Sequence, residues 1–460
     1  MEHLPEPILL EILTRLTDST ELARCRLVSK TFNKLIFSDI RSINLTCTLS
    51  RYLKSRSPNT KDQITPFKRI FNRLVNRSDS LVVDSVTIGV EKSLCGITYD
   101  DVEEDEWSDD LYLSEVEFVK EWLLLPRVCR ELKFLSISDF WIQACWRRSQ
   151  ILALVSSCCH GLLELEVKNS WLSVDGLIPM PVLTSLTLES IRLDDENLSK
   201  VNHCFPCLKV LNLVGVGGLR EPKIHLYHLR TCRWTVSNAP NSLSIFAPNL
   251  LKLELNCIEP RSLILETPLL SDFYLSIRKA NKFKVKQLHD LKILQLESTD
   301  ILSLIRLFPS NSSVERLTVD SPKYAIQTDE MIRLNLEMLF DVFMNVSSLT
   351  LLSAAWSDME KCFLTNGLRH DMEMKELKEV IVQLVIQDID VTLSFIFTIL
   401  DKCTNLSDVG LLIHCEVDPN VASSLLSRCK ADHPRIRWRW GMWKEGSKGT
   451  WISDGIYPAT

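Results

Sequence analysis

The sequence predicts an α/β solenoid: a horseshoe of stacked repeats with a parallel sheet on its concave face, preceded by a small module of three helices. Three observations support this fold class. An apolar triplet recurs along most of the chain, helical segments precede many of the triplets, and residues 1–40 lack the triplet and carry a helical pattern of their own.

The recurring triplet has the spacing L-x-x-L-x-L and, with two exceptions, returns 20 to 30 residues after the previous one. This period and this spacing are typical of leucine-rich repeats. One unit cannot bury its own apolar face, whereas a stack of units shares a continuous core. The thirteen units begin at Val83, Leu132, Leu162, Leu183, Leu208, Leu229, Leu250, Leu270, Leu291, Val314, Leu349, Leu377 and Leu406.

Within a unit, the triplet predicts a short strand whose second and third apolar residues point inward, because side chains alternate between the two faces of a strand. The segments before several triplets have helical spacing, and a proline two residues before the first leucine, as at Pro181 and Pro206, ends the preceding helix. Helices or irregular turns are therefore expected on the outer side. The clearest predicted helices are 118–125, 150–157, 302–308, 339–344 and 392–400.

Residues 1–40 predict three short helices. The first begins near Pro5, since proline lacks the N–H that would have no partner in a first helical turn anyway. Asp18 with Glu21 is typical of a capping box that opens a second helix, and Ser29 can cap a third. A module of this size buries little surface alone, so we expect it to need a partner. Its apolar residues at helical spacing are Ile8, Leu9, Ile12, Leu13, Leu16, Leu22, Cys25, Leu27, Phe32, Leu35 and Ile36.

Three further segments complete the predicted organisation. Residues 41–80 form a basic connector with helical character, interpreted as a solvated joint between modules. The repeats occupy residues 81–430, with an insertion at 100–110 whose eight acidic residues form either a solvated loop or a docking site for a basic partner. Residues 431–460 match no repeat, and their tryptophans and arginines indicate a strand that caps the last repeat, with an aromatic nucleic-acid site as the alternative.

Composition and the N-terminus argue against several classes of protein. The net charge of −6 is too small to imply a nucleic-acid or membrane partner, and no run reaches the ~18 apolar residues that a membrane span requires. Glu2, His3, Glu6 and Glu11 interrupt what would be the apolar part of a signal peptide. The 15 cysteines are therefore expected to be reduced thiols in a cytoplasmic or nuclear protein.

No motif predicts a catalytic, cofactor-binding or metal-binding residue. Cys204 and Cys207 form a single C-x-x-C pair, whereas structural zinc usually takes two such pairs. Cys129, Cys159 and Cys403 each lie three residues before the first leucine of a unit, and this shared register indicates buried small apolar residues. The sequence therefore predicts a binding protein and no enzyme.

The N-terminal module resembles an F-box. An F-box begins with Leu-Pro, continues into a first helix rich in Ile and Leu, and later carries a segment of the form R-x-V-S-K-x-F. The resemblance covers about 40 residues, and an F-box followed by leucine-rich repeats is similar to the plant class of F-box/LRR proteins. The F-P-x-L-x-x-L-x-L segment from Phe205 also has the form typical of that class. The matching residues are Leu4, Pro5, Ile8, Leu9, Ile12, Leu13, Leu16, Arg26, Leu27, Val28, Ser29, Lys30 and Phe32.

This resemblance implies that the F-box binds a Skp1-like adaptor, and through it a cullin, in a ubiquitin ligase whose target is held by the repeats. The chain would then be a non-catalytic substrate receptor. Two alternatives stay open: an interaction scaffold whose F-box-like module engages no adaptor, and an enzyme with an essential cysteine. The resemblance assigns adaptor contact to Leu4, Pro5, Ile8, Leu9, Ile12 and Val28, and the alternative for each is a place in the core of the module.

The outward-facing strand positions indicate the kind of target. These are the third, fifth and seventh positions of each unit, and they carry nine acidic residues against the basic residues Lys168, Arg233, Lys252 and Arg316. The excess favours a protein target with a basic surface and disfavours nucleic acid or an inositol-phosphate cofactor like that of the hormone-receptor branch of the class. The predicted target-binding residues are Glu164, Glu166, Glu189, Glu254, Asp272 and Glu297; the other three acids are Asp320, Glu379 and Asp408.

Overall fold

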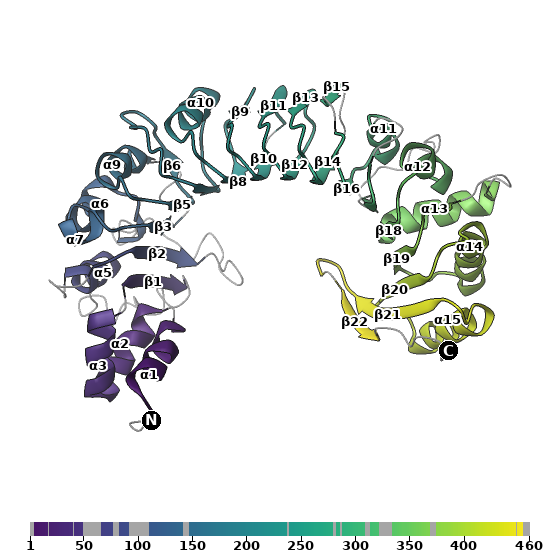
Figure 1. The fold of residues 1–460 in the computed structure, drawn as a ribbon, viewed down its shortest axis with the longest axis horizontal. Coiled ribbons are helices and arrows are strands. Elements are labelled where there is room, and N and C mark those ends of the chain that lie inside the picture. Colours follow the sequence, from purple (N-terminus) through teal and green to yellow (C-terminus); the bar gives the residue numbers. More distant parts are fainter. Residues whose placement is uncertain are drawn as a thin grey trace, which may run out of the picture. The chain divides into compact units, whose positions relative to one another are not determined.

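The computed structural model divides the chain into two compact units, Met1–Asn238 and Ala239–Thr460. In each unit the principal strands pair in parallel in the order of the sequence, and the helices that follow or precede them lie on one side of the sheet (Figure 1). The residues that the structure describes are 4–16, 18–39, 41–48, 66–76, 82–91, 110–140, 147–236, 239–278, 282–285, 288–308, 313–321, 334–368, 374–447 and 449–453.

The first unit contains the three N-terminal helices and the first seven strands of the repeats, in the order β1-β2-β3-β5-β7-β8-β10. Its helices are α1 (Glu6–Thr14), α2 (Ser19–Val28), α3 (Lys30–Asp39), α5 (Phe67–Asn76), α6 (Val116–Leu123), α7 (Pro126–Cys129), α9 (Ile151–Cys158) and α10 (Asp195–Cys204). Its strands are β1 (Ser42–Thr48), β2 (Ser85–Glu91), β3 (Phe134–Ser138), β4 (Arg148–Ser149), β5 (Glu164–Lys168), β6 (Trp171–Leu172), β7 (Ser185–Glu189), β8 (Val210–Val216), β9 (Lys223–His225) and β10 (Thr231–Val236).

The second unit continues the pattern with the strand order β12-β14-β16-β17-β18-β19-β20-β21-β22, in which only the last pairing is antiparallel. Its helices are α11 (Ile301–Ile305), α12 (Leu336–Val342), α13 (Ser353–Asn366), α14 (Ile389–Lys402) and α15 (Pro419–Asp432). Its strands are β11 (Ser242–Phe246), β12 (Lys252–Cys257), β13 (Ser262–Glu266), β14 (Asp272–Ile277), β15 (Lys282–Val285), β16 (Ile293–Glu297), β17 (Arg316–Asp320), β18 (Ser348–Leu351), β19 (Glu379–Leu384), β20 (Asp408–His414), β21 (Arg437–Trp443) and β22 (Thr450–Ser453).

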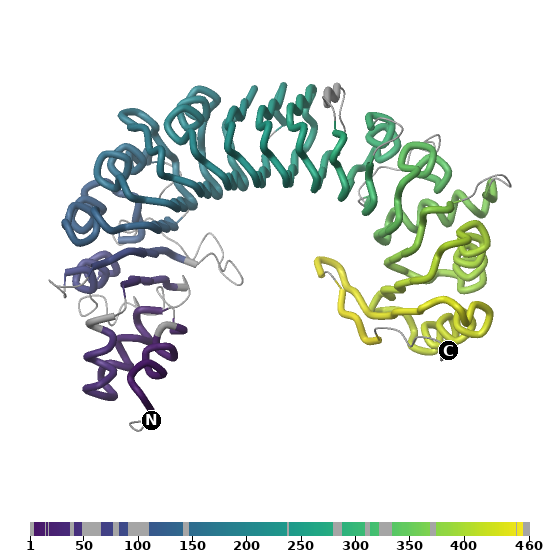
Figure 2. Tube along the Cα trace, in the orientation of Figure 1, coloured from purple at the N-terminus to yellow at the C-terminus, as the bar shows by residue number. Residues whose placement is uncertain are grey.

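The core of each unit is a ladder of aliphatic side chains, as the triplet predicts. In β5 the inward residues Leu165 and Val167 are buried, and Leu165 pairs in register with Leu186 of β7. Burying one such side chain stabilises the fold by about 1.5–3 kcal/mol. Figure 2 shows the successive turns of the Cα trace from which these strands come. The leucine-rich-repeat fold is therefore confirmed in both units.

Most unit starts were predicted correctly, but one was not. Leu349 pairs in register with Leu317, which is the second apolar residue of its own triplet. The unit therefore begins at the buried Val346, three residues earlier than predicted. The predicted helices, in contrast, each overlap a helix of the structure: α6, α9, α11, α12 and α14.

A strand in the segment 41–80 was not predicted. Ile43 and Leu45 of β1 pair in register with Val86 and Ile88 of β2, and all four side chains are buried. The predicted helical character of this segment corresponds to α5. The first repeat strand thus follows the N-terminal helices directly.

The outer side of the sheet depends on repeat length. The long repeats near the C-terminus have room for helices of 14 residues, namely α13, α14 and α15. The repeats that begin at Leu250 and Leu270 have only 20 and 21 residues. In these repeats the outer side is a second parallel sheet, in which β11 pairs with β13 and β13 with β15. Helices or irregular turns were predicted there, so this part of the prediction is wrong for the short repeats.

The described part of the C-terminal segment forms two more strands. β21 pairs in parallel with β20, so that Trp438 lies opposite Val409 and Trp440 opposite Leu411. β22 then pairs antiparallel with β21. The Trp451 ring packs on Gly410 so closely that a Cβ at that position would lie 2.8 Å from it. The last repeat is thereby covered by tryptophan side chains.

One buried carboxylate in the first unit accepts hydrogen bonds from residues that are distant in the sequence. Asp139 is 1% exposed, and its carboxylate accepts hydrogen bonds from the backbone N–H of Leu113, from the N–H of Ser114 at 2.9 Å and from the Ser170 hydroxyl. Ser149 donates in turn to the Ser114 carbonyl at 2.6 Å. Burial raises the pKa of Asp139 to about 6, although these hydrogen bonds act in the opposite direction.

Asp139→Asn is expected to raise the melting temperature near neutral pH. Because the folded pKa exceeds the ordinary value of 3.8, the stability that Asp139 contributes is largest below that value and falls as the pH rises toward 6. Asparagine avoids the burial of charge and still accepts both N–H groups, so the gain should be about 1–3 kcal/mol at about pH 7.5 and near zero at about pH 4. Asp139→Ala should lower stability at both pH values, because the buried N–H groups lose their acceptor. Thermal melts of the three proteins at the two pH values check this, and an unchanged or lower melting temperature of Asp139→Asn at the higher pH would contradict it.

Candidate functional site

Helix α1 carries apolar side chains on two neighbouring sides. Leu9 and Leu13 face inward and form the core of the module with Leu22, Leu35 and Ile36. The neighbouring side exposes Ile8 and Ile12, whose exposed fractions are 48% and 42%, and Leu4, which lies two residues before the helix, is 39% exposed. Residues four apart lie on one side of a helix, so Ile8 and Ile12 are neighbours on its surface. Together with Leu4 they are here named the α1 stripe.

The predicted adaptor-binding residues divide between these faces. Leu4, Ile8 and Ile12 form the α1 stripe, and Pro5 beside them is also exposed. Leu9 is only 3% exposed and belongs to the core of the module. A surface contact through Leu9 is therefore unsupported, and its alternative interpretation as a core residue describes it better.

A second exposed apolar pair lies at the end of helix α2. Val28, one of the predicted adaptor-binding residues, is 77% exposed, and its neighbour Leu27 is 89% exposed. Leu27 was grouped with Leu22 and Cys25 by its spacing, but it lies outside the module's core. Exposed leucine and valine side chains on a module this small indicate a surface that is covered by a partner.

The N-terminal module is joined to the first repeat by a cap and a short connection. The Asp18 side chain accepts a hydrogen bond from the Thr20 N–H at 2.8 Å, which confirms the predicted N-cap of α2. The next residue, Ser19, accepts a hydrogen bond from the backbone N–H of Asn44 in β1 at 2.8 Å. The N-terminal module is thus connected to the first repeat strand by a hydrogen bond as well as by the chain.

The basic helix α5 packs against the first repeats. Its Phe71 ring makes edge-on contacts with Phe118 and Trp122 of α6, at centroid distances of 6.0 and 5.2 Å. Lys68 forms an ion pair with Glu115. Asp110 accepts hydrogen bonds from the N–H groups of Phe67 and Lys68, so it caps α5. The rest of the predicted acidic insertion, residues 100–109, lies outside the described residues.

The outward strand positions, here named the strand face, carry the predicted charges in the predicted register. In the first unit, Glu164 is exposed while Glu166 and Glu189 are half-buried. Lys168 lies between the last two, with its Nζ 3.4 Å from Glu166 and 3.6 Å from Glu189. Glu166 also accepts a hydrogen bond from Ser136 at 3.0 Å. A single lysine therefore serves two of the three predicted carboxylates in this unit.

In the second unit, each predicted carboxylate has a different environment. Asp272 forms an ion pair with Lys252 at 3.4 Å. Glu297 accepts a hydrogen bond from the Tyr274 hydroxyl at 2.6 Å. Glu254 lies on β12 in register with Tyr274 of β14. Lysine therefore holds Asp272, whereas a neutral phenol contacts Glu297.

Two arginines of the strand face were missed. Arg437 and Arg439 lie on β21, a strand that the sequence analysis did not count as a repeat. Arg439 contacts Asp408 at 2.7 Å and Glu379 at 2.5 Å, and its guanidinium lies 5.0 Å from the centroid of the Trp451 ring. Glu379 and Asp408 are thus held by intramolecular ion pairs. The alternation of R-W-R-W from Arg437 would have indicated a strand.

Burial was predicted for the three cysteines that lie three residues before the first leucine of a unit, and two of the three are buried. Cys159 and Cys403 are buried, whereas Cys129 is half-buried. Among the described residues, no group of three or more His, Cys, Asp or Glu side chains could hold a metal ion. Likewise, the described part of the chain contains no helix long and apolar enough to cross a membrane.

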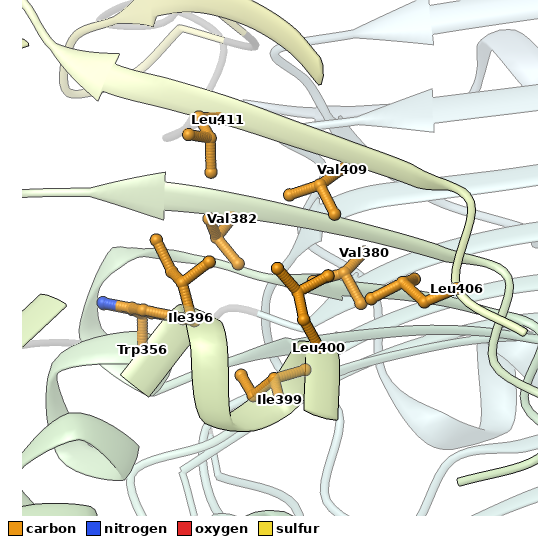
Figure 3. A pocket seen from close by; sticks show the side chains of 9 residues that line it. All are labelled: Trp356, Val380, Val382, Ile396, Ile399, Leu400, Leu406, Val409 and Leu411. Atoms are coloured by element: carbon orange, nitrogen blue, oxygen red, sulfur yellow. The ribbon is translucent and has the colours of Figure 1, made fainter. Parts of the chain in front are cut away.

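A small cavity in the second unit belongs to the core. It has a volume of about 10 Å³ and is lined only by apolar residues, which come from α13, α14, the segment after α14, β19 and β20 (Figure 3). A space of this size has room for about one water molecule but offers it no polar partner. The cavity is therefore a packing defect between sheet and helices and not a ligand site.

Two comparisons with known proteins match the N-terminal module and the repeats of this chain. A family model described as F-box-like matches residues 1–45, which include α1, α2 and α3. An F-box/LRR-repeat protein of Arabidopsis thaliana is 49% identical to this chain over 456 residues, which cover 98% of this chain and 100% of that protein. The similarity therefore extends over both the N-terminal module and the repeats.

Proposed function

Because the chain belongs to the F-box/LRR-repeat proteins, we propose that it is the substrate-recognition subunit of a Skp1-cullin-F-box ubiquitin ligase. The F-box binds the Skp1-like adaptor, the adaptor connects the chain to the cullin, and the repeats bind a target protein. The chain itself is non-catalytic. Its contribution is proximity, because holding a target lysine near the ubiquitin carrier raises the effective concentration of the two.

The α1 stripe is the observation that carries this proposal. An F-box-like module that exposes Leu4, Ile8 and Ile12 on and just before its first helix, with Leu27 and Val28 exposed at the end of α2, has the apolar surface that a helical adaptor can cover. Covering these side chains would recover the free energy lost by exposing them to water. We assign adaptor contact to Leu4, Pro5, Ile8, Ile12 and Val28, and we add Leu27.

A capture experiment tests this proposal. The full chain, immobilised on beads, should retain a purified Skp1-like adaptor, and Leu4→Ala with Pro5→Ala should abolish that capture. The alternative function, an interaction scaffold that assembles no ligase, predicts that the wild-type chain retains no adaptor at all. The exposed Ile452 on β22, changed to Ala, provides a control on the opposite end of the chain.

For the target, we propose a protein with a basic surface that binds the strand face. The candidate residues are Glu164, Glu166 and Glu189 in the first unit and Glu254, Asp272 and Glu297 in the second. Acidic residues exceed basic ones on this face even when Arg437 and Arg439 are added to the four bases predicted from the sequence. The targets can be identified as the proteins that accumulate in cells lacking the chain and that the purified chain binds directly. The free thiols of the described cysteines agree with a reducing compartment, so we place the complex in the cytoplasm or the nucleus.

Reversing the charge of Glu164, Glu166 and Glu189 to lysine should weaken the binding of such a target by at least about tenfold, because like charges face each other across the interface. The adaptor should still bind with wild-type affinity, since these residues lie on the repeats. Calorimetric titration of the captured target and of the adaptor against the same variant checks both statements. Unchanged target affinity would remove the first unit's strand face from the interface.

A further inference from the structure

One row of outward side chains on the strand face of the second unit is interrupted by a glycine. Gly410 of β20 has Ile381 of β19 as its neighbour in register on one side and Arg439 of β21 on the other. Neighbouring strands are about 4.8 Å apart, so the two flanking side chains stand about 10 Å apart with none between them. This space is here named the Gly410 notch. In the same row, the preceding strands β12, β14, β16, β17 and β18 carry the side chains Glu254, Tyr274, Gln295, Thr318 and Thr350.

An indole ring fills the Gly410 notch. Trp451 of β22 is half-buried, and a Cβ added to Gly410 would lie 2.8 Å from its ring and 3.3 Å from the Ile381 side chain. The Arg439 guanidinium lies 5.0 Å from the centroid of the same ring, which is within the range of a cation–π contact. A glycine inside a strand is typical of a place where another group approaches the backbone closely. The notch therefore fits an aromatic ring between an aliphatic and a cationic side chain.

The sides of the notch are held in place by contacts that do not involve Trp451. The Arg439 guanidinium forms ion pairs with Asp408 at 2.7 Å and with Glu379 at 2.5 Å, and both carboxylates come from preceding strands. Parallel pairing on both sides fixes the backbone of Gly410. A site whose walls are fixed in advance loses less conformational freedom when a ligand binds. We therefore expect the notch to keep its shape when the ring leaves.

The strand that supplies the ring is short and lies at the end of the sheet. β22 spans four residues and, among the strands that the structure describes, pairs with β21 alone (Figure 1). Its residues Thr450 and Ile452 are exposed, so Trp451 is the large side chain that anchors β22. Short terminal elements with few buried contacts open at a lower free-energy cost than the core. Opening β22 therefore costs less than unfolding the repeats before it.

We propose that the Gly410 notch is a binding site for an aromatic side chain of the target, and that Trp451 occupies it in the free chain. The ring of the target takes the place of Trp451 between Ile381 and Arg439, and β22 opens as it enters. Tryptophan fits best, because a cation is attracted most strongly to the face of an indole. β22 thus competes with the target, and a segment without an aromatic residue does not displace it. This inference rests on the proposed function and adds an aromatic residue to the basic surface expected of the target.

The first test measures whether the emptied notch binds an aromatic ring. The full chain with Trp451→Ala is titrated with indole by calorimetry, because an apolar cavity left by a truncated side chain takes up a small apolar ligand. Its Kd for indole should be at least tenfold lower than that of the wild type. Adding Gly410→Val to this variant fills the notch and should abolish indole binding, and thermal melts check that both variants are folded. Indole binding that is equal in the wild type and Trp451→Ala, or that survives Gly410→Val, would overturn the proposal.

The second test leaves Trp451 in place and so does not depend on the folding of a truncated variant. A phage library of random dodecapeptides is selected on the wild-type chain and, as the control, on Gly410→Val. Peptides enriched on the wild type alone should contain tryptophan or another aromatic residue, and replacing that residue with leucine should weaken binding at least tenfold in fluorescence anisotropy. The bound peptide should also speed the hydrogen exchange of the β22 amides at least threefold.

A selection that yields no such aromatic peptide, or unchanged exchange of β22 beneath a bound peptide, would equally contradict the proposal. Neither adaptor nor cullin takes part in these measurements. The adaptor assay and the assays of the Gly410 notch can therefore fail independently.

Discussion

Replacing Leu4, Ile8 and Ile12 together with alanine is expected to abolish binding of the chain to a Skp1-like adaptor while leaving its fold intact. All three side chains are between 39% and 48% exposed, so their truncation removes little from the core of the chain. In a complex each would be buried, and the loss of about 1–2 kcal/mol at each position corresponds to a rise in the adaptor Kd of at least about 100-fold.

Two control variants distinguish the loss of a surface contact from damage to the core of the fold. Ile178, Leu251 and Leu269 lie on the repeats and are exposed to a similar degree, so their triple alanine variant should bind the adaptor normally. Leu13→Ala should also reduce adaptor binding, but through the fold, because truncating a buried leucine costs about 2–5 kcal/mol. Binding is measured by calorimetry and folding by thermal melting. Wild-type adaptor affinity in the α1 stripe variant would show that these three residues are not the interface.

The second large effect is expected at the C-terminal end of the repeats. Trp438 is 3% exposed, lies opposite Val409 and donates an indole hydrogen bond to the His433 carbonyl at 3.1 Å. Trp438→Ala should lower the stability of the terminal repeat by about 3–5 kcal/mol. In a repeat protein each unit is stabilised mainly by its neighbours, so the loss should appear locally before the whole chain unfolds.

Hydrogen exchange detects this local effect directly. In Trp438→Ala the amides of β20 and β21 should exchange faster, whereas the amides of β12 and β14 in the same unit should keep their protection. Met442→Ala, on the same strand but 42% exposed, is the matched control and should leave all four strands unchanged. Equal protection of β20 in wild type and Trp438→Ala would show that β21 does not cap the repeats.

Much of the fold could be predicted because the triplet indicates both where a strand lies and which of its side chains point inward. Once Leu165 and Val167 are assigned inward, Glu164, Glu166 and Lys168 must face outward, and the structure has them there. The error at Leu349 arises where apolar residues are crowded. Leu349, Leu351 and Leu352 allow two registers, and only pairing with Leu317 and Val319 chooses between them.

Other features depend on contacts between separate segments of the chain, which the pattern of residues within one segment does not encode. The S-I-N-L segment of β1 contains only two inward apolar residues that the structure describes, Ile43 and Leu45, and becomes recognisable as a strand through its pairing with β2. In the N-terminal module, spacing alone placed Leu9 and Ile8 on one apolar helix. The packing of α1 on α3 decides that Leu9 is core and Ile8 is surface.

The charged residues of the strand face could be predicted in part, because the register of the triplet indicates which residues of a strand point outward. The acids were assigned correctly from the register, but their partners come from other strands. Arg439 reaches Glu379 two strands away, and the Tyr274 hydroxyl reaches Glu297 on the next strand. Sequence distance gave no indication of either contact, because it does not tell which side chains share a row of the sheet.

The most direct test of the proposed function is the mass of the complex in solution. The purified chain is mixed with a Skp1-like adaptor and a cullin N-terminal domain and analysed by size-exclusion chromatography with light scattering. We expect one species whose mass equals one copy of each component, and its loss when Leu4, Ile8 and Ile12 are changed to alanine. Elution of the wild-type chain alone, beside an intact adaptor–cullin pair, would contradict its assignment as a ligase subunit.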